Sequence, residues 1–236
     1  MAKRLFDLVF SAIGLIVFSP ILLLTALWIK LDSKGPVFYR GERTGLNGVP
    51  FRIFKFRSMV TNADKIGGPS TADTDSRITK SGKFIRKFKL DEIPQFMNVF
   101  IGDMSFVGPR PEVKKYTDMY TPEEKPILDL RPGITDWASI WNSDEGAILA
   151  GLEDVDAGYE QYIRPGKLKL QLYYRANHTV MGDIKILMYT ARRIFDKSFY
   201  PSEIDAVVPR LVPVLDQQRM THAAVELSES AREPQI

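Results

Sequence analysis

The first thirty residues carry the longest apolar stretch of the chain. From Leu5 to Leu31 the only interruptions are five polar residues, Asp7, Ser11, Ser19, Thr25 and Lys30. As one straight helix this stretch would extend about 40 Å at 1.5 Å per residue, enough to cross a hydrocarbon core of about 30 Å. The pattern therefore predicts a helical segment that enters a membrane.

Three kinds of membrane segment have this pattern. A cleaved signal peptide fits poorly, because the apolar region is too long and no small-x-small cleavage site follows it. A spanning helix is the usual interpretation, but Lys3 and Arg4 precede the stretch while Lys30 and Lys34 follow it. Because both flanks are positive, neither is marked as the cytoplasmic end. A re-entrant hairpin would keep both flanks at one membrane face.

The dipeptide Ser19-Pro20 favours the hairpin. Pro20 removes the N–H that would have bonded the carbonyl of Ile16, so the helix bends there. The Ser19 hydroxyl can reach back to the carbonyl of Leu15 or Ile16 and satisfy it in lipid. Cut at the bend, the arms of about 14 and 12 residues extend about 21 and 18 Å, and each is too short to cross. We predict a re-entrant helix-break-helix hairpin over residues 1–34, with a kinked spanning helix as the alternative.

The chain after the membrane segment predicts an α+β fold that is mostly helical. Two short strands within residues 36–59 are joined around Asn47-Gly48, a strong signal for a small β-hairpin. We expect this domain to cover residues 35–200, followed by a C-terminal tail over residues 201–236.

Two helices of the domain are predicted from their periodicity. Apolar residues recur at i, i+3, i+4 and i+7 from Ile93 to Phe100, and Gly102 ends that helix. From Asp183 to Phe195 apolar residues occupy one side and basic residues the other. The second pattern is typical of a surface amphipathic helix, which would either lie on the membrane or pack on the domain.

The composition limits the kinds of catalytic and metal-binding site that the chain can form. The chain has no cysteine and only two histidines, which excludes disulfides, thiol nucleophiles and metal sites rich in Cys or His. Acid-base or nucleophilic chemistry is therefore expected from carboxylates. The formal charge is +3, but residues 1–90 carry +10 and the remainder −7. A cationic first third suits an anionic lipid surface, a nucleotide or both. Its mixture of aromatic and basic residues would suit nucleic acid in isolation, but beside a membrane segment we expect no nucleic-acid partner.

The candidate site lies in the middle of the chain. Six basic residues precede it, namely Arg77, Lys80, Lys83, Arg86, Lys87 and Lys89. Asp91 and Glu92 follow at a predicted helix start, where carboxylates either cap the helix or serve a site that binds anions. Further on, Arg110 is fixed between Pro109 and Pro111, a good position for a phosphate or pyrophosphate. A carboxylate among bound phosphates would also suit Mg²⁺.

Seven motifs in a fixed order resemble the bacterial sugar transferase family of monotopic phosphoglycosyl transferases. They are KRLFDLVFS, the membrane Ser19-Pro20, GPVFYRGERTG, FRIFKFRSM, DSRITKSGKFIRK, LDEIPQFMNVFIGDMSFVGPRPE and RPGIT. The resemblance runs from about Lys3 to Phe195 and is closest to the small, single-unit members. It implies transfer of a sugar-1-phosphate from a UDP-sugar to a polyprenol (undecaprenyl) phosphate at the cytoplasmic face of the inner membrane, with release of UMP.

The resemblance also implies roles for individual residues. Asp91 takes the position of the nucleophile and Glu92 that of its partner, and both are candidate ligands of Mg²⁺, the family's cofactor. Arg86 and Arg110 correspond to contacts with phosphate and nucleotide. We further assign substrate or phosphate contacts to Arg77, Pro109 and Lys55.

One stretch departs from the family pattern. After RPGIT many members continue Gly-Trp-Ala-Gln-Val-Asn-Gly, but this chain has Asp136-Trp137-Ala138-Ser139-Ile140-Trp141-Asn142. If this segment faces the sugar, the identity of the sugar is in doubt more than the reaction. The rival function is a non-catalytic adaptor on anionic membranes, in which Asp91 and Glu92 are only helix caps. Interfacial helices would allow a homodimer, but nothing in the sequence requires one.

Overall fold

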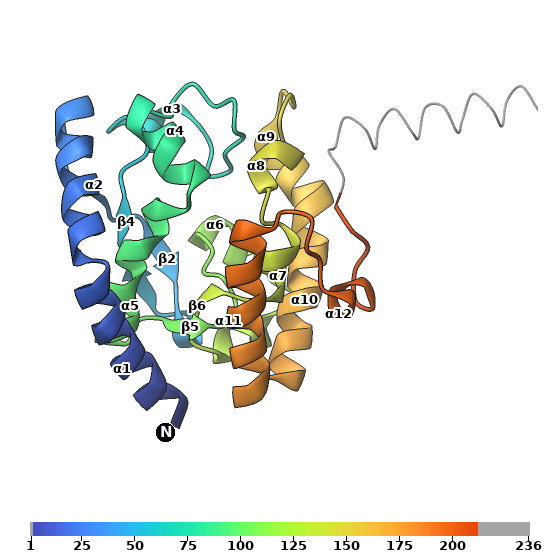
Figure 1. The fold of residues 1–236 in the computed structure, drawn as a ribbon. Coiled ribbons are helices and arrows are strands. Elements are labelled where there is room, and N and C mark those ends of the chain that lie inside the picture. The colour runs from blue at the N-terminus through green and yellow to red at the C-terminus, as the bar shows by residue number, and fades with distance from the viewer. Residues whose placement is uncertain (1, 212–236) are drawn as a thin grey trace, which may run out of the picture.

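Two N-terminal helices, α1 (Ala2–Val17) and α2 (Ser19–Asp32), lie along one side of the molecule (Figure 1). The computed structural model describes residues 2–211. The helices meet at a 60° bend, where the Ser19 hydroxyl donates to the carbonyl of Ile16 over 2.7 Å. The predicted bend and its hydrogen bond are therefore confirmed. Within residues 2–211 no single helix is long and apolar enough to cross a bilayer, whereas this bent pair meets the length and composition criteria together.

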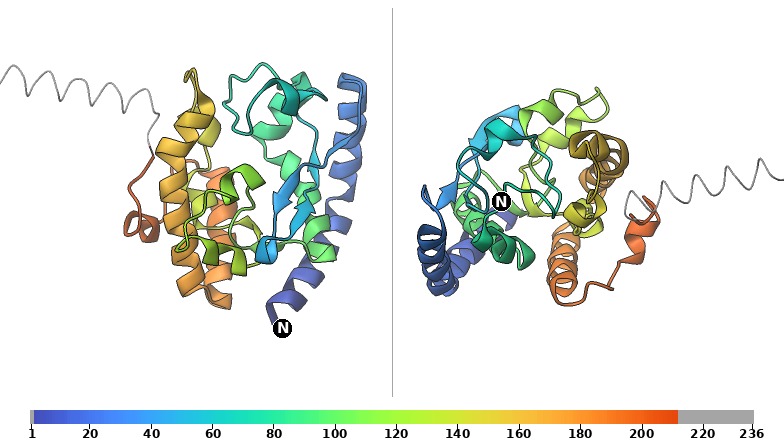
Figure 2. Two further views of the ribbon diagram at one scale, coloured as in Figure 1. Left: turned by 180° about the vertical axis from the view of Figure 1, so that it is seen from behind. Right: turned by 90° about the horizontal axis from the view of Figure 1, so that it is seen from above.

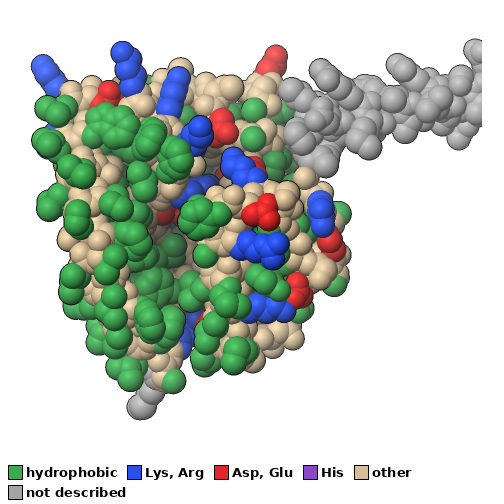
Figure 3. Space-filling model, viewed as in Figure 1, with side chains coloured by type: hydrophobic (Ala, Val, Ile, Leu, Met, Phe, Trp, Pro, Cys, Tyr) green, Lys and Arg blue, Asp and Glu red, His purple; other side chains and the backbone are tan. Residues whose placement is uncertain are grey.

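Three polar residues of the apolar segment face the rest of the protein. Asp7 and Ser11 on α1 and Thr25 on α2 are buried, while large apolar side chains of both helices are exposed. Figure 3 shows these apolar side chains gathered over the side where α1 and α2 lie. The outer face is thus apolar and the inner face carries the polar contacts, which is the reverse of a helix in a water-soluble domain.

The first turn of α1 is tied to distant parts of the chain. Lys3 donates to the carbonyl of Val107 over 2.8 Å and forms an ion pair with Asp183. Arg4 donates to the carbonyls of Val99 and Phe100 over 2.6 and 2.8 Å. These charged groups fix the outer helices to the body of the protein.

Short strands occupy the middle of the molecule, between α1–α2 on one side and the C-terminal helices on the other (Figure 2). In residues 2–211 they form three two-stranded sheets. The antiparallel pairs are β1 (Phe38–Tyr39) with β4 (Lys55–Phe56) and β2 (Glu42–Thr44) with β3 (Pro50–Arg52), and the parallel pair is β5 (Ser105–Val107) with β6 (Gly133–Thr135). Asn47 and Gly48, both with positive φ, turn the chain between β2 and β3, so the predicted hairpin is confirmed.

Helices form most of the remaining structure, and the α+β class is confirmed. In chain order they are α3 (Ala63–Ile66), α4 (Lys80–Lys87), α5 (Phe96–Ile101), α6 (Lys114–Thr117), α7 (Trp137–Trp141), α8 (Glu145–Ile148), α9 (Val155–Gly158), α10 (Arg164–Asn177), α11 (Val180–Phe195) and α12 (Ser202–Asp205). Three short 3₁₀-helices are η1 (Leu46–Gly48), η2 (Leu90–Gln95) and η3 (Lys125–Asp129), and η4 (Tyr159–Ile163) is a π-helix.

The helix predicted around Ile93 is divided between two conformations. Residues Leu90–Gln95 form the 3₁₀-helix η2, and only Phe96–Ile101 are α-helical. Lys89 adopts a left-handed conformation before η2, and Pro94 lacks the N–H that an α-helical bond would need. Gly102, with φ of 102°, ends the helix as predicted.

The largest apolar core joins β5, α7, α10 and α11. It includes both tryptophans of α7, Trp137 and Trp141, which are buried. Ile204 and Val208 belong to the same core, so packing continues past residue 200 into the predicted tail, whose residues 212–236 lie outside the described part.

The helix α11 packs on the body through Asp183 and Ile186, which are buried. It also exposes large apolar residues, among them Val180, Met181, Ile184 and Met188. Packing on the domain is therefore confirmed, whereas contact of the exposed apolar residues with a membrane stays a prediction.

Candidate active site

The sequence-predicted acidic dyad, Asp91 and Glu92, lies in η2 and faces cations from two other elements. Lys55 on β4 places its Nζ 3.3 Å from Asp91 Oδ2 and 3.0 Å from Glu92 Oε1. Arg110, in the loop after β5, pairs with Glu92. Neither carboxylate is a side-chain cap, because η2 has no side-chain cap hydrogen bond. The geometry therefore favours a site over the helix-cap alternative.

Asp91 has one oxygen that nothing in the described chain binds. The residue is only 5% exposed, and its Oδ1 is buried without a hydrogen-bond partner among residues 2–211. A buried carboxylate oxygen without a donor is costly unless another group approaches it. This oxygen is consequently the best-placed atom of the site for a cation or for bond formation.

Glu92 has both oxygens engaged. Arg110 Nη1 donates to Oε2 over 3.2 Å, and Arg110 Nη2 donates to Oε1, the oxygen that also accepts from Lys55. Burial alone would raise the pKa of Glu92, but the charges of Arg110 and Lys55 outweigh burial and hold that pKa well below its usual range. The charge of Glu92 in turn raises the pKa of Arg110. Glu92 is thus ionised near neutral pH and poorly suited to move a proton.

The backbone around Arg110 is held by neighbouring elements. Its N–H donates to Asp136 Oδ2 over 3.3 Å, and its Nη1 also donates to the carbonyl of Ile134 over 3.2 Å. Immediately before it, Gly108 lies against Gly133 so closely that a Cβ on Gly133 would come within 2.1 Å of the Gly108 nitrogen. Only glycines allow the two loops to approach so closely, and this contact brings Pro109 and Arg110 beside the dyad.

Arg77 is engaged elsewhere. Its guanidinium pairs with Asp75 at 2.6 Å and donates to the carbonyls of Ala63, Gly68 and Ser70. The Arg77 side chain is the first cause of the lowered pKa of Asp75. In this structure Arg77 therefore organises the loop over residues 61–76, and its five N–H groups are used there.

Arg86 lies in the last turn of α4 and is half-buried. Within residues 2–211 its guanidinium makes no ion pair or hydrogen bond. Its charge also contributes to the lowered pKa of Asp75, after the larger contribution of Arg77. Arg86 thus lies on the Asp75 side of the site, and its predicted phosphate contact stays a prediction.

Few residues are available for a metal. The described residues hold no group of three or more Asp, Glu, His or Cys side chains in metal-binding proximity. Mg²⁺ commonly uses one or two carboxylates together with substrate phosphates and water. Asp91 Oδ1 fits that pattern, whereas both oxygens of Glu92 already accept from cations. The predicted Mg²⁺ therefore fits Asp91 better than Glu92.

Two polar residues of the site were not singled out as functional from the sequence. Asp136 is fully buried and accepts from Ser139 and from Arg110, and the departure from the family pattern at this position was its only signal. Gln95 is also fully buried, and neither atom of its amide has a partner among residues 2–211. Its position four residues after Asp91 in one predicted helix is the signal that could have found it.

Comparison with known proteins identifies the family of the chain. A profile described as bacterial sugar transferase matches residues 1–197. The chain therefore belongs to the bacterial sugar transferase family.

Several curated relatives are similar over most of the chain. The UDP-N-acetylgalactosamine-undecaprenyl-phosphate N-acetylgalactosaminephosphotransferase of Aeromonas hydrophila is 37% identical over 81% of this chain and 43% of that protein. The uncharacterized sugar transferase EpsL of Bacillus subtilis is 37% identical over 81% of this chain and 86% of that protein. The UDP-glucose:undecaprenyl-phosphate glucose-1-phosphate transferase of Escherichia coli is 36% identical over 83% of this chain and 40% of that protein. The chain thus spans less than half of two of these relatives.

Proposed function

We propose that the protein transfers a sugar-1-phosphate from a UDP-sugar to undecaprenyl phosphate and releases UMP. The observation that carries this proposal is the buried, unpartnered Asp91 Oδ1 beside Lys55 and the Glu92–Arg110 pair. The printed names of the relatives from A. hydrophila and E. coli support the reaction class and its two substrates.

The proposed reaction has two displacements. In the first, the carboxylate of Asp91 attacks the phosphorus that bears the sugar, the bond from that phosphorus to the bridging oxygen breaks, and UMP leaves with this oxygen. The sugar phosphate is then held on Asp91 as an acyl phosphate. In the second, an oxygen of polyprenol phosphate attacks the same phosphorus, and the carboxylate of Asp91 leaves. The product is a polyprenyl diphosphate sugar, and the expected kinetics are ping-pong.

Neighbouring cations offset the repulsion between Asp91 and an anionic diphosphate. Lys55 lies against Asp91, and Arg110 can exchange its contacts with Glu92 for phosphate oxygens. Glu92 holds both cations in place in the free enzyme. Mg²⁺, held by Asp91 and by the phosphates, would neutralise further charge on the diphosphate.

The N-terminal helices are proposed to form a re-entrant hairpin that keeps the site at the cytoplasmic face of the inner membrane. The 60° bend, the apolar outer face of α1 and α2, and the exposed apolar residues of α11 support this arrangement. A soluble UDP-sugar and a lipid-borne phosphate would meet at such a surface. Since the chain has no native cysteine, single cysteines at residues 2 and 34 can be labelled from either side of the membrane. Labelling from opposite sides would exclude the hairpin.

The reaction is tested by UMP release from a panel of UDP-sugars with polyprenol phosphate and Mg²⁺. We expect release with at least one donor, and we expect Asp91→Asn to abolish both turnover and trapping of labelled phosphosugar on the protein. An Asn variant that still turns over would exclude Asp91 as nucleophile. If the wild type releases no UMP with any donor, the adaptor function is favoured instead.

A further inference from the structure

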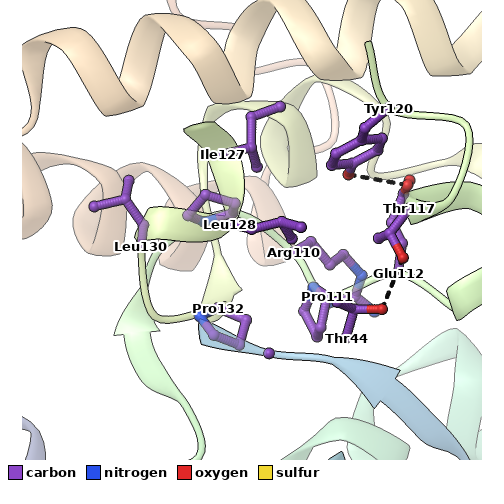
Figure 4. Close-up of a pocket in the computed structure, with 12 residues that line it drawn as sticks. Thr44, Arg110, Pro111, Glu112, Thr117, Tyr120, Ile127, Leu128, Leu130 and Pro132 are labelled. Carbon is purple, nitrogen blue, oxygen red and sulfur yellow. Dashed lines mark hydrogen bonds between the residues drawn. The ribbon is translucent and has the colours of Figure 1, made fainter. Parts of the chain in front are cut away.

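A buried ion pair lies directly behind the loop that carries Arg110. Glu112 follows Arg110 by two residues, and its Oε1 is 2.6 Å from Nζ of Lys167 on α10, with both side chains less than 10% exposed. Two buried tyrosine hydroxyls donate to the same carboxylate, Tyr159 over 2.6 Å and Tyr120 over 3.2 Å. Figure 4 shows Glu112 and Tyr120 together with Arg110 around a small cavity.

Both members of this pair are charged despite their burial. Burial alone would raise the pKa of Glu112, but the charge of Lys167 and the three donated hydrogen bonds lower it. Burial would lower the pKa of Lys167, but the charge of Glu112 raises it. A buried ion pair stabilises a fold little more than apolar residues of the same volume would. Folding stability alone therefore does not account for these charges.

The pair fixes one end of the main chain around Arg110. The Glu112 carbonyl accepts from Thr44 N over 2.9 Å, and its side chain is bound to Lys167. One turn along α10, Gln171 Nε2 reaches the Arg110 carbonyl at 3.4 Å. From one face of α10, Lys167 therefore binds the Glu112 side chain after Pro111, and Gln171 binds the Arg110 carbonyl before it.

Arg110 is held at its other end as well. Its N–H is bound to Asp136, and prolines on both sides restrict the backbone. With the main chain held on both sides, only the Arg110 side chain is free to turn from Glu92 toward a ligand. The reach of its guanidinium is then set by the elements behind the loop.

We infer that the Glu112–Lys167 pair is a positioning device for Arg110, which sets the guanidinium where it meets the diphosphate of a nucleotide sugar. This inference rests on the proposed function and adds two positioning residues to it. Neither residue touches the substrate, and each acts through Arg110. A displacement of about 1 Å at such a contact can cost about 100-fold in rate.

A double-mutant cycle in the full-length protein tests the inference. Glu112→Gln with Lys167→Met removes both charges while keeping the side-chain volumes similar, and Arg110→Lys alters the residue through which they act. We expect the first pair of changes to lower kcat/KM for the UDP-sugar by about 10- to 100-fold in the wild-type background. In the Arg110→Lys background the same changes should cost less than about threefold. Equal losses in both backgrounds, or no loss in the first, would overturn the inference.

A matched control separates positioning from a general effect on α10. Arg175 on α10 pairs with Asp129 at 2.9 Å, but this pair is exposed, and within residues 2–211 it makes no hydrogen bond or ion pair with residues 108–112. Arg175→Gln with Asp129→Asn should leave kcat/KM unchanged. If the Glu112 and Lys167 changes prevent folding, Tyr120→Phe removes one hydrogen bond to Glu112 and enters the same cycle with the same expectation.

Hydrogen exchange gives a readout that does not depend on turnover. The amides of Gly108, Arg110 and Glu112 should exchange faster in the Glu112→Gln, Lys167→Met protein. Their exchange rates should be unchanged in the Arg175 control. If the wild type releases no UMP from any UDP-sugar, the proposed function fails while this exchange result still decides whether the pair holds the loop. Unchanged exchange would overturn the inference.

Discussion

Arg110 donates two hydrogen bonds to the carboxylate of Glu92, so the arginine best placed for a diphosphate is already bound to a carboxylate in the free protein. Under the proposed function, the diphosphate of the substrate would compete with Glu92 for this guanidinium. This competition predicts that changes at Arg110 and at Glu92 shift KM for the UDP-sugar in opposite directions.

Arg110→Met should lower kcat by about 10²- to 10³-fold, because a donor to the charge that develops on the transferred phosphate is lost, and it should raise KM for the UDP-sugar. Glu92→Gln should lower KM, because an anion that competes for Arg110 and Lys55 is removed. Steady-state kinetics of UMP release measure both values. A rise of KM in the Glu92→Gln protein would contradict the competition.

The pairing of Glu92 also predicts a pH dependence of stability. Its pKa is held well below the ordinary 4.5, so the ion pairs stabilise the fold fully above that pH, and this stabilisation is lost as the pH falls through the lowered pKa. The difference in Tm between wild type and Glu92→Gln should be constant from about pH 5 to 8 and shrink at lower pH. Glu153→Gln, at an exposed glutamate, is the control and should leave Tm unchanged throughout. A difference that stays constant down to about pH 3 would show that the pKa of Glu92 is not lowered in the folded protein.

The contacts of Asp7 predict that making α1 more apolar at this position lowers the stability of the protein. Its Oδ1 accepts from Ser105 Oγ and from the Phe106 N–H, both over 3.1 Å. Asp7→Leu would leave these buried donors without a partner, at a cost of about 1–3 kcal/mol each. We therefore expect a lower Tm in detergent, with Asp7→Asn retaining most of the stability because it keeps an acceptor oxygen. Equal Tm values for the Leu and wild-type proteins would contradict this role.

Changing Arg77 to Met and changing Arg86 to Met should have different effects on the stability of the protein. Arg77→Met removes the centre of the loop over residues 61–76, and should lower Tm and speed proteolysis within that loop. Arg86→Met removes a side chain without a partner in residues 2–211, and should leave the free energy of unfolding within about 0.5 kcal/mol. If Arg86 contacts phosphate, its variant should nevertheless raise KM. Matching effects of the two changes on stability would argue against this division.

Local signals in the sequence predicted local features well. The bend at Ser19-Pro20, the turn at Asn47-Gly48 and the helix end at Gly102 each depend on a backbone preference of the residue itself, and the structure has all three. Pro94 carried a similar signal, but its effect on the conformation of η2 was not predicted. Short-range chemistry also explains Arg77, because Asp75 lies two residues away and binds its guanidinium.

Contacts between distant residues could not be derived in the same way. The dyad was found from its motif, but no spacing in the sequence indicates that Lys167 would lie behind the Arg110 loop or that β5 and β6 pair in parallel. Such contacts depend on how the helices pack. The sequence alone contains several acidic residues that could pair with each lysine. The apolar outer face of α11 has a related cause, since Asp183, the polar residue of its first turn, turns inward to meet Lys3.

The ion pair between Lys3 and Asp183 joins residues 180 positions apart. At translation rates of about 5–20 residues per second, roughly 10–35 seconds pass between synthesis of the first residue and synthesis of its partner. During that interval the nascent N-terminal helices have no finished body to which they can attach. Contacts of α1 with residues 99–107 can form earlier, but the ion pair with Asp183 is a late event in the maturation of the protein.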